Sequence, residues 1–358
     1  MRRIVVVQTA FLGDVVLTTP LLAELRRAHP EARISVVATP VGAEALEGQP
    51  FLDDVERFDK RGRGRGPLAL VALAGRLRGA DAAVAAQRSA RTGLLVRLSG
   101  APHRIGFRGA PGAFAYTEAV PWRAEGHAVS RYLDLARPLG GSPEGADPRP
   151  RLEVLAGAGE RIAEGLRECG IPEGARLLAV APGSVWGTKR WLPSGFSAVL
   201  RGAAERGLAA VLVGSGEERP LCREIAEAAG VGAAVLAGRM TIPDLAAVLG
   251  ASEALVSNDS GSGHVASAVG TPVVTVFGPT VPEFGYSPFG DGNRVVERPG
   301  LPCRPCDRHG PDRCPLGHFR CMREIGAEEV LSALDEALEA RAASGGQGTT
   351  GRDGLPAR

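Results

Sequence analysis

Residues 256–280 have the sequence Val256-Ser-Asn-Asp-Ser-Gly-Ser-Gly-His-Val-Ala-Ser-Ala-Val-Gly-Thr-Pro-Val-Val-Thr-Val-Phe-Gly-Pro-Thr280. Apolar, β-branched runs at both ends enclose a Gly-rich polar turn, which predicts a strand, a tight turn, a short helix and a second strand. Gly261 and Gly263 would let backbone N–H groups approach an anion such as a phosphate where the helix begins. Asp259 adds an acceptor beside these donors. The combination suits a ligand that has both hydroxyl and phosphate groups, such as a nucleotide sugar.

Strands and helices are expected to alternate along the whole chain, because apolar runs of strand length recur between stretches of helical periodicity. Strands are predicted at residues 4–7, 34–38, 82–86, 104–107, 177–181, 209–213, 254–256 and 272–277. Helices are predicted at residues 21–28, 68–77, 93–98, 196–205, 221–229, 242–249 and 327–342. Short βα units of this kind indicate an α/β fold with parallel sheets covered by helices on both faces.

Residues 138–150 break this alternation, since they are dense in Pro and Gly. We therefore predict an N-terminal Rossmann-like domain over residues 1–150 and a C-terminal one over residues 151–342. Residues 343–358 are polar and Gly-rich, which predicts a disordered tail. Two doubly wound domains that face each other would place a cleft between the carboxyl ends of both sheets, where ligands bind in such folds.

The composition is that of an ordinary soluble globular protein, with 358 residues, 44% of them hydrophobic and 23% charged. No apolar run approaches the ~20 residues needed to span a bilayer. Gln8 and Asp14 interrupt the apolar stretch near Met1, and no small-residue cleavage site follows it, so we predict a first buried strand rather than a signal peptide. The expected location is the cytoplasm.

The charge is distributed unevenly, because residues 1–150 hold 21 Lys and Arg against 15 Asp and Glu, whereas the whole chain has a net charge of only +2. The densest basic cluster consists of Arg57, Lys60, Arg61, Arg63 and Arg65. This cluster is either a solvated loop or a contact for an anionic membrane surface or an acidic acceptor. Nucleic acid is not an expected partner, because the chain is barely basic and aromatics make up only 4% of it.

Asp14 follows the first predicted strand directly, in the segment Phe11-Leu-Gly-Asp-Val-Val-Leu-Thr-Thr-Pro20. Gly13 permits a tight turn there, and a carboxylate at the carboxyl end of a strand could act as a general base towards an acceptor hydroxyl. The alternative is that Asp14 caps the following helix, although Thr19-Pro20 could itself mark a helix start. The spacing leaves both interpretations open.

Two further loops follow strands of the second domain. Thr188, Lys189 and Arg190 offer a hydroxyl and two cations, which suit a diphosphate leaving group, although a surface loop with solvated charges is the alternative. In Val213-Gly-Ser-Gly-Glu-Glu218 the third glycine of a dinucleotide fingerprint is missing. Glu217 could accept hydrogen bonds from ribose hydroxyls, or the two glutamates could simply favour a helix N-terminus.

Four cysteines lie close together in the sequence, at Cys303, Cys306, Cys314 and Cys321. The first pair has the spacing of metal ligands, so a structural zinc site is one hypothesis. Four reduced thiols in an irregular segment are the alternative. Ser260 and His264 lie too close to Asp259 in sequence for a hydrolase triad, and the chain has no G-x-S-x-G elbow.

Taken together in this order, the motifs resemble glycosyltransferase family 9, the bacterial ADP-heptose:lipopolysaccharide heptosyltransferases. The resemblance extends over residues 3–330 and is strongest in the segments Gly13-Asp14…Thr18-Thr19-Pro20, Thr188-Lys189-Arg190-Trp191, Asp259-Ser260-Gly261…His264 and Phe277-Gly278-Pro279-Thr280. Cys314-Pro-Leu-Gly-His-Phe-Arg-Cys-Met322 is similar to the heptosyltransferase II type. Gln8-Thr-Ala-Phe11 and the Arg/Gly loop at residues 62–66 depart from the family pattern.

The resemblance implies a GT-B fold and an inverting glycosyltransferase that needs no cofactor for catalysis. Asp14 would be the catalytic base towards the acceptor, and Asp259 would bind hydroxyls of the donor sugar. Glu217 would hold the ribose, and Met240 would lie against the adenine. The donor diphosphate would be bound by Thr188, Lys189, Ser260, Gly261 and His264.

The implied donor is ADP-heptose, and the implied acceptor is the anionic inner core of lipopolysaccharide. An acceptor of this kind predicts peripheral contact with the cytoplasmic face of the inner membrane. Two alternatives remain open. The first is another GT-B enzyme with a different nucleotide sugar, or a nucleotide-sugar epimerase, and the second is a non-enzymatic module that binds anionic lipid.

Overall fold

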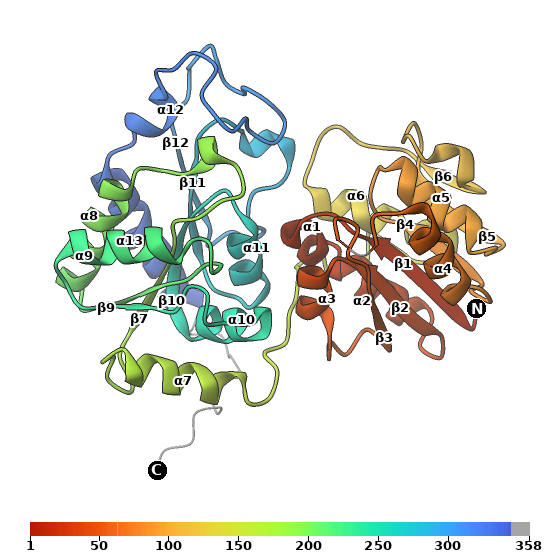
Figure 1. Cartoon of the computed structure of the whole chain (residues 1–358), viewed down its shortest axis with the longest axis horizontal. Helices are drawn as coiled ribbons and strands as arrows, with labels where there is room; N and C mark the ends of the chain where they lie inside the picture. The colour runs from red at the N-terminus through yellow and green to blue at the C-terminus, as the bar shows by residue number, and fades with distance from the viewer. Residues whose placement is uncertain (63, 345–358) are drawn as a thin grey trace. The chain divides into compact units, whose positions relative to one another are not determined.

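The computed structural model describes residues 1–62 and 64–344. The chain forms two units, which divide between Leu152 and Glu153. In Figure 1 the first unit is coloured from red to yellow and the second from green to blue. Each unit contains a six-stranded sheet, and all of the paired strands are parallel.

The first unit has its strands in the order β3-β2-β1-β4-β5-β6. Its elements are β1 (Arg3–Gln8), α1 (Leu12–Leu17), α2 (Thr19–Ala28), β2 (Arg33–Ala38), α3 (Pro40–Leu46), β3 (Asp54–Arg57), α4 (Pro67–Arg76), β4 (Ala82–Ala85), α5 (Ala90–Leu98), β5 (His103–Phe107), the 3-10 helix η1 (Ala113–Ala115), β6 (Glu118–Val120), α6 (Ala128–Asp134) and η2 (Arg137–Leu139).

The second unit has its strands in the order β12-β11-β10-β7-β8-β9. Its elements are α7 (Ala158–Glu168), β7 (Leu177–Ala181), η3 (Gly187–Lys189), α8 (Pro193–Glu205), β8 (Ala209–Leu212), α9 (Arg219–Ala229), β9 (Ala233–Val235), α10 (Ile242–Ala251), β10 (Ser252–Asn258), α11 (Gly261–Ala268), β11 (Val273–Phe277), η4 (Pro282–Phe284), β12 (Arg294–Glu297), α12 (Arg320–Arg323) and α13 (Ala327–Ser344).

Both sheets have the same topology, since the strands of each unit, counted from its own first strand, lie in the order 3-2-1-4-5-6. The direction of winding reverses between β1 and β4 in the first unit and between β7 and β10 in the second. In doubly wound sheets, ligands bind outside the carboxyl ends of the strands at this switch point. The loops after β1, β7 and β10 are therefore where the fold places candidate site residues.

Helices cover both faces of each sheet, which explains the continuous apolar runs of the central strands. In the second unit, α8, α9 and α13 pack together on one face, and α7, α10 and α11 lie on the other (Figure 1). All five residues of β7 and all five of β11 are buried, as are the last five of β1. The two sheets thus form the centres of the two hydrophobic cores.

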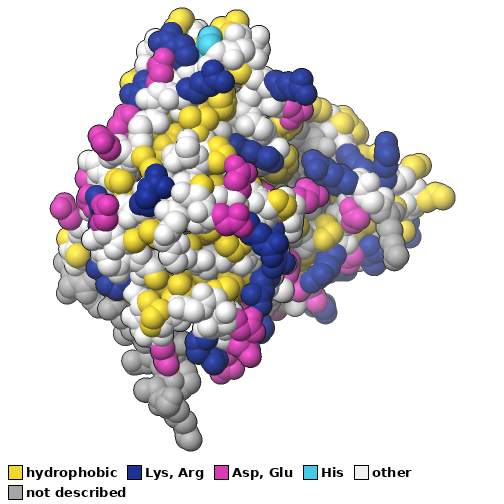
Figure 2. Space-filling model, turned by 60° about the vertical axis from the view of Figure 1, so that its left-hand side comes forward, with side chains coloured by type: hydrophobic (Ala, Val, Ile, Leu, Met, Phe, Trp, Pro, Cys, Tyr) yellow, Lys and Arg dark blue, Asp and Glu magenta, His cyan; other side chains and the backbone are white. Residues whose placement is uncertain are grey.

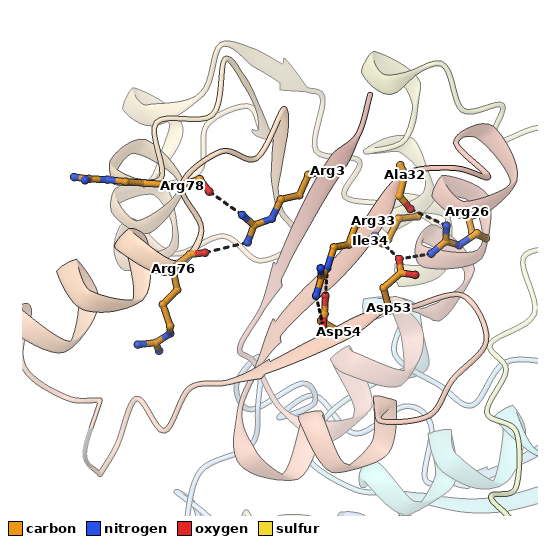
Figure 3. Close-up of polar contacts among 9 residues, drawn as sticks. All are labelled: Arg3, Arg26, Ala32, Arg33, Ile34, Asp53, Asp54, Arg76 and Arg78. Carbon is orange, nitrogen blue, oxygen red and sulfur yellow. Dashed lines mark hydrogen bonds and ion pairs between the residues drawn. The ribbon is translucent and has the colours of Figure 1, made fainter.

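The opposite, amino-terminal edge of the first sheet is held together by its own arginines (Figure 3). The Arg33 guanidinium donates two hydrogen bonds to the Asp54 carboxylate, at 2.5 and 2.8 Å. Arg26 pairs with Asp53 at 2.5 Å and also donates to the Ala32 carbonyl. Arg3 donates to the carbonyls of Arg76 and Arg78. Part of the basic character of this unit is therefore used to stabilise the fold.

The predicted strands are confirmed, with shifts of at most two residues at their ends. Four strands were not predicted from the sequence, and these are the edge strands of the two sheets, β3, β6, β9 and β12. The last helix is two residues longer than expected, because α13 continues through residues 343 and 344. The rest of the predicted disordered tail, residues 345–358, lies outside the described residues.

The surface mixes both signs of charge. On the face seen in Figure 2, Lys and Arg side chains lie next to Asp and Glu side chains, with hydrophobic side chains between them. Within the described ranges, none of the helices combines the length and the apolar character that a membrane span requires.

Candidate functional site

Asn258 joins two loops at the switch point of the second sheet. It is the last residue of β10 and is fully buried. Its side-chain NH2 group donates to the Pro182 carbonyl at 2.7 Å, and its side-chain oxygen accepts from the Trp191 N–H at 2.9 Å. Residues 182–191, which follow β7, are thereby fixed at both ends against the end of β10. Asn258 was not among the site residues predicted from the sequence.

Lys189 and Asp259 meet within this frame. The Lys189 Nζ lies 2.5 Å from Asp259 Oδ2, and the Thr280 hydroxyl donates to the same oxygen at 2.8 Å. The two charged side chains are only 13% and 12% exposed. The structure therefore brings together three of the segments that carry the family resemblance, around one largely buried ion pair.

Thr188 is buried, with 4% of its surface exposed. Its hydroxyl donates to the Pro311 carbonyl, so it contacts a segment more than a hundred residues away in sequence. This hydrogen bond was not foreseen. In the described conformation the Thr188 hydroxyl proton is therefore used in a hydrogen bond within the protein. Of Thr188 and Lys189, only Lys189 offers a charged group to a ligand.

The turn after β10 leads into α11 as predicted. Ser260 is the N-cap residue, and Gly261 begins the helix. The N–H groups of the first turn of a helix have no partner within the helix, so they are available to an anion. Ser260 Oγ is buried without a hydrogen-bonding partner among the described residues, and the His264 side chain is 6% exposed. These groups lie beside Asp259, within one turn of the chain.

The two glutamates after β8 differ in position. Glu217 is exposed, whereas Glu218 Oε2 accepts a hydrogen bond from the Ser215 N–H at 2.7 Å. The Glu218 carboxylate lies directly against Gly183, where a Cβ atom would be 1.8 Å from Oε1. Because Gly183 follows β7, it is Glu218 that faces the carboxyl ends of β7 and β8. Met240, which is partly buried, lies just after β9, the next strand in the sheet.

Asp14 lies inside α1, whose N-cap residue is Phe11, so the alternative that Asp14 caps the helix is wrong. Asp14 Oδ1 accepts a hydrogen bond of 2.9 Å from the Tyr132 hydroxyl of α6. Tyr132 is 4% exposed and therefore well fixed in the core. A buried phenol thus orients the carboxylate at the switch point of the first sheet.

Lys60 lies near this carboxylate. Burial, together with the charges of Arg61 and Arg91, lowers the pKa of Lys60, while the nearby Asp14 acts in the opposite direction. The Arg61 guanidinium lies over the Phe11 ring at 5.9 Å, and Arg91 lies over Phe58 at 5.1 Å. The basic cluster predicted from the sequence therefore extends to Arg91, which follows β4. Arg57 is paired with Glu47 at 2.7 Å, and Arg63 lies outside the described residues.

The structure gives no support to the predicted zinc site. Cys303, Cys306, Cys314 and Cys321 are free thiols. Cys306 Sγ donates to the Cys303 carbonyl, and Cys303 Sγ lies 3.9 Å from His318 Nε2. Across residues 1–62 and 64–344, no three His, Cys, Asp or Glu side chains are placed so that they could hold a metal ion together. The CxxC spacing is that of a metal site, but the four thiols are not placed as a set of metal ligands.

Comparison with known proteins identifies the family. Residues 70–313 match the model of glycosyltransferase family 9 (heptosyltransferase). The match covers more than half of the chain, which therefore belongs to this family and is a glycosyltransferase. The chain is 26% identical over 309 residues to lipopolysaccharide heptosyltransferase 2 of Escherichia coli K12, covering 82% of this chain and 87% of that protein. It is 28% identical over 348 residues to lipopolysaccharide heptosyltransferase 1 of Pseudomonas aeruginosa PAO1, covering 92% and 93%.

Solved structures confirm the GT-B fold class. The glycosyltransferase family 9 structure from Veillonella parvula superposes with a TM-score of 0.85 at 24% identity, covering 95% of this chain and 98% of that one. The structure of E. coli ADP-heptose lipopolysaccharide heptosyltransferase II superposes with a TM-score of 0.75 at 22% identity, covering 96% and 100%. The doubly wound α/β units predicted from the sequence are therefore confirmed, whereas the roles of individual site residues stay predictions.

Proposed function

We propose that this glycosyltransferase transfers heptose from ADP-heptose to the inner core of lipopolysaccharide. The observation that carries the proposal is the meeting of Lys189, Asp259 and the start of α11 at the switch point of the second sheet. A cation, a hydroxyl-binding carboxylate and free N–H groups together suit a sugar joined to a diphosphate. The relatives named as lipopolysaccharide heptosyltransferases support this choice of donor and acceptor.

In the proposed reaction, a hydroxyl oxygen of the acceptor attacks the anomeric carbon of the heptose. The bond from that carbon to the diphosphate oxygen breaks, and ADP leaves with the electron pair. Asp14 takes the proton from the attacking hydroxyl as general base. Attack from the face opposite the leaving group inverts the anomeric configuration.

The leaving diphosphate gains negative charge as the bond breaks. Lys189 and the N–H groups at Ser260 and Gly261 would stabilise this charge, with His264 beside them, because fixed donors are most effective in a site that excludes water. Asp259 would hold hydroxyls of the heptose. Thr188 would contribute from the same turn, either directly or through its hydrogen bond to Pro311.

The acceptor side of the proposal rests on Lys60, which lies near Asp14, and on the cations Arg61 and Arg91 near Lys60. Lys60, Arg61 and Arg91 can bind the phosphate or carboxylate groups of an inner-core acceptor, and a bound anion would bring its neighbouring hydroxyl to the base. The hydrogen bond from Tyr132 keeps the Asp14 carboxylate oriented. An anionic lipid is the acceptor class that fits this arrangement.

The test is a transfer assay with purified protein, ADP-heptose, and truncated lipopolysaccharides that each lack one further core sugar. UDP- and GDP-sugars serve as competing donors. Asp14→Asn should lower kcat by ~10²-fold or more. Glu31→Gln, an exposed change at the amino-terminal edge of the same sheet, is the control. Transfer from UDP- or GDP-sugars but not from ADP-heptose would show that the proposed donor is wrong.

A peripheral membrane contact is part of the proposal. Leu68 and Val71 of α4 are 84% and 56% exposed, and Arg65 lies just before this helix. Exposed apolar side chains with cations beside them suit the interface of an anionic bilayer. Flotation with phosphatidylglycerol vesicles should fall for Leu68→Ser/Val71→Ser and not for Leu316→Ser, which changes an exposed leucine of the second unit. Equal flotation of both variants would contradict the contact.

A further inference from the structure

The segment between Cys306 and Cys314 contacts the loop that carries Thr188 and Lys189. We call residues 307–313 of this segment the strap. The His309 ring stacks on the Trp186 ring, with centroids 6.5 Å apart and planes inclined by 18°. The Thr188 hydroxyl donates to the Pro311 carbonyl. Two residues of the strap therefore hold two residues of the loop that follows β7.

Glycines allow the two backbones to approach closely. A Cβ atom on Gly187 would lie 2.7 Å from the Asp312 carbonyl oxygen. Gly310 has φ +86, a left-handed conformation that favours glycine. A Cβ atom on Gly310 would lie 3.3 Å from Thr188 Oγ1 and 3.4 Å from Lys189 Cγ. Residues 309–312 of the strap thus lie against residues 186–189 of the loop, through both backbone and side chains.

The base of the strap is fixed to the other side of the ion pair. The Cys306 N–H donates to the Pro279 carbonyl at 2.9 Å. The Arg304 guanidinium, only 5% exposed, donates to the Thr280 carbonyl at 2.8 Å and pairs with Glu297 at 2.7 Å. Thr280 is the residue whose hydroxyl donates to Asp259. One continuous segment therefore holds Lys189 from one side and the partner of Asp259 from the other.

We infer that the strap is a positioning element of the donor site: it holds Lys189 and Asp259 in the position in which they bind a nucleoside diphosphate sugar. This inference rests on the proposed function of the Lys189 site. It also assigns a role to the cysteine-rich segment that requires no metal, because residues 303–306 and 314 flank the strap on its two sides. Thr188 and His309 act through Lys189, and are positioning residues in this sense.

A pair of glycine substitutions tests the inference. Gly310→Ala crowds Pro279, at 3.1 Å from the new Cβ, and Thr188, at 3.3 Å, and so presses the strap against the Lys189 loop. Gly317→Ala adds the same left-handed strain, at φ +71, with no atom within 4 Å of the new Cβ. In the free protein, hydrogen exchange of the amides of Lys189 and Arg190, which close the turn η3, should accelerate about tenfold in Gly310→Ala and stay unchanged in Gly317→Ala. Affinity for ADP should fall about tenfold in Gly310→Ala alone.

A second variant covers the case in which Gly310→Ala does not fold. His309→Ala removes the ring from Trp186 without backbone strain, and should accelerate the same amides and change the Trp186 fluorescence, whereas His318→Ala should do neither. Equal exchange at residues 189 and 190 in each variant and its control would overturn the inference, whatever nucleotide binds. A different outcome is that exchange changes as expected but the unsubstituted protein does not bind ADP. That result would overturn the proposed donor and, with it, the strap's role in donor binding. The contact between the strap and the Lys189 loop would still be supported.

Discussion

The ammonium of Lys189 and the carboxylate of Asp259 are 2.5 Å apart and nearly nine-tenths buried. Charges in such surroundings need a partner, since an unpaired buried charge is costly. Each of the two residues is therefore the counter-ion of the other in the free protein. A donor diphosphate that approached Lys189 would add a second anion to the pair, and the Thr280 hydroxyl would remain as a donor to Asp259.

Removing one member of this pair should destabilise the second unit more than removing both. We expect Asp259→Ala to lower the free energy of unfolding by about 2–3 kcal/mol, because Lys189 is left buried without its counter-ion. Lys189→Met/Asp259→Ala should cost less than Asp259→Ala alone, and therefore less than the sum of the two single changes. Urea unfolding of the four proteins gives the coupling. Strictly additive losses would mean that the ion pair contributes nothing to the folded state.

Tyr132→Phe should slow the transfer reaction without unfolding the first unit. The change removes the hydrogen bond to Asp14 Oδ1 but keeps the ring that fills the core. With the carboxylate less well oriented, kcat should fall about tenfold, while the KM values of donor and acceptor change little. Steady-state kinetics with both substrates varied provides the measurement. A rise in KM at constant kcat would assign Tyr132 to substrate binding instead.

Glu218, rather than its neighbour, should matter for nucleotide binding. Glu218 faces Gly183 at the carboxyl end of β7, whereas Glu217 is exposed. If ribose hydroxyls donate to the Glu218 carboxylate, Glu218→Gln should weaken ADP binding about tenfold, because hydrogen bonds to a charged acceptor are worth more than those to an amide. Glu217→Gln is the matched control, and calorimetric titration with ADP compares the two. The opposite ranking would support the role that the sequence suggested for Glu217.

The sequence predicted the central strands of both sheets and none of the edge strands. Strands such as β7 and β11 are covered on both faces, so that every residue is buried and, apart from Thr275, apolar. The edge strand β3 has the sequence Asp-Val-Glu-Arg, with no buried residue. Edge strands bear one row of solvent-exposed backbone groups and are commonly short and charged, so their side chains carry little periodic signal. An edge strand forms by pairing with the neighbouring strand of the sheet, so its own sequence gives little sign of it.

The candidate site was predictable where its residues are adjacent in sequence. The turn from Asp259 to Gly261 and the pair Thr188-Lys189 follow from local composition, since a parallel sheet exposes the loops at its carboxyl edge. The bond between Lys189 and Asp259 joins residues 70 positions apart, and that between Tyr132 and Asp14 spans 118 positions. Such pairs depend on packing, which a single sequence does not encode in any local pattern. The zinc hypothesis rests on cysteine spacing alone, and such spacing does not fix where the side chains point.

Alkaline pH should destabilise the protein through groups that the fold keeps neutral. Burial raises the pKa of Tyr116 from 10.0 to about 12. A group whose pKa is raised in the folded state contributes stability below its unfolded pKa, and this contribution is lost as the pH rises through the folded value. The phenol of Tyr116 should therefore lower the free energy of unfolding between pH 10 and 12. Burial likewise raises the pKa of Cys222 from 9.0 to about 12, so the decline should begin near pH 9.

Tyr116→Phe isolates the phenol's share of this alkaline loss. The Tyr116 hydroxyl is buried without a hydrogen-bonding partner among the described residues, so its removal should leave the protein at least as stable at pH 7, with a gain of up to about 1 kcal/mol. Between pH 10 and 12 the variant should lose less stability than the unsubstituted protein, while both should share the earlier loss due to the thiols. Urea unfolding at pH 7, 9, 10 and 11.5 measures the difference. Parallel curves above pH 10 would mean that the phenol ionises as easily in the folded chain as in the unfolded one.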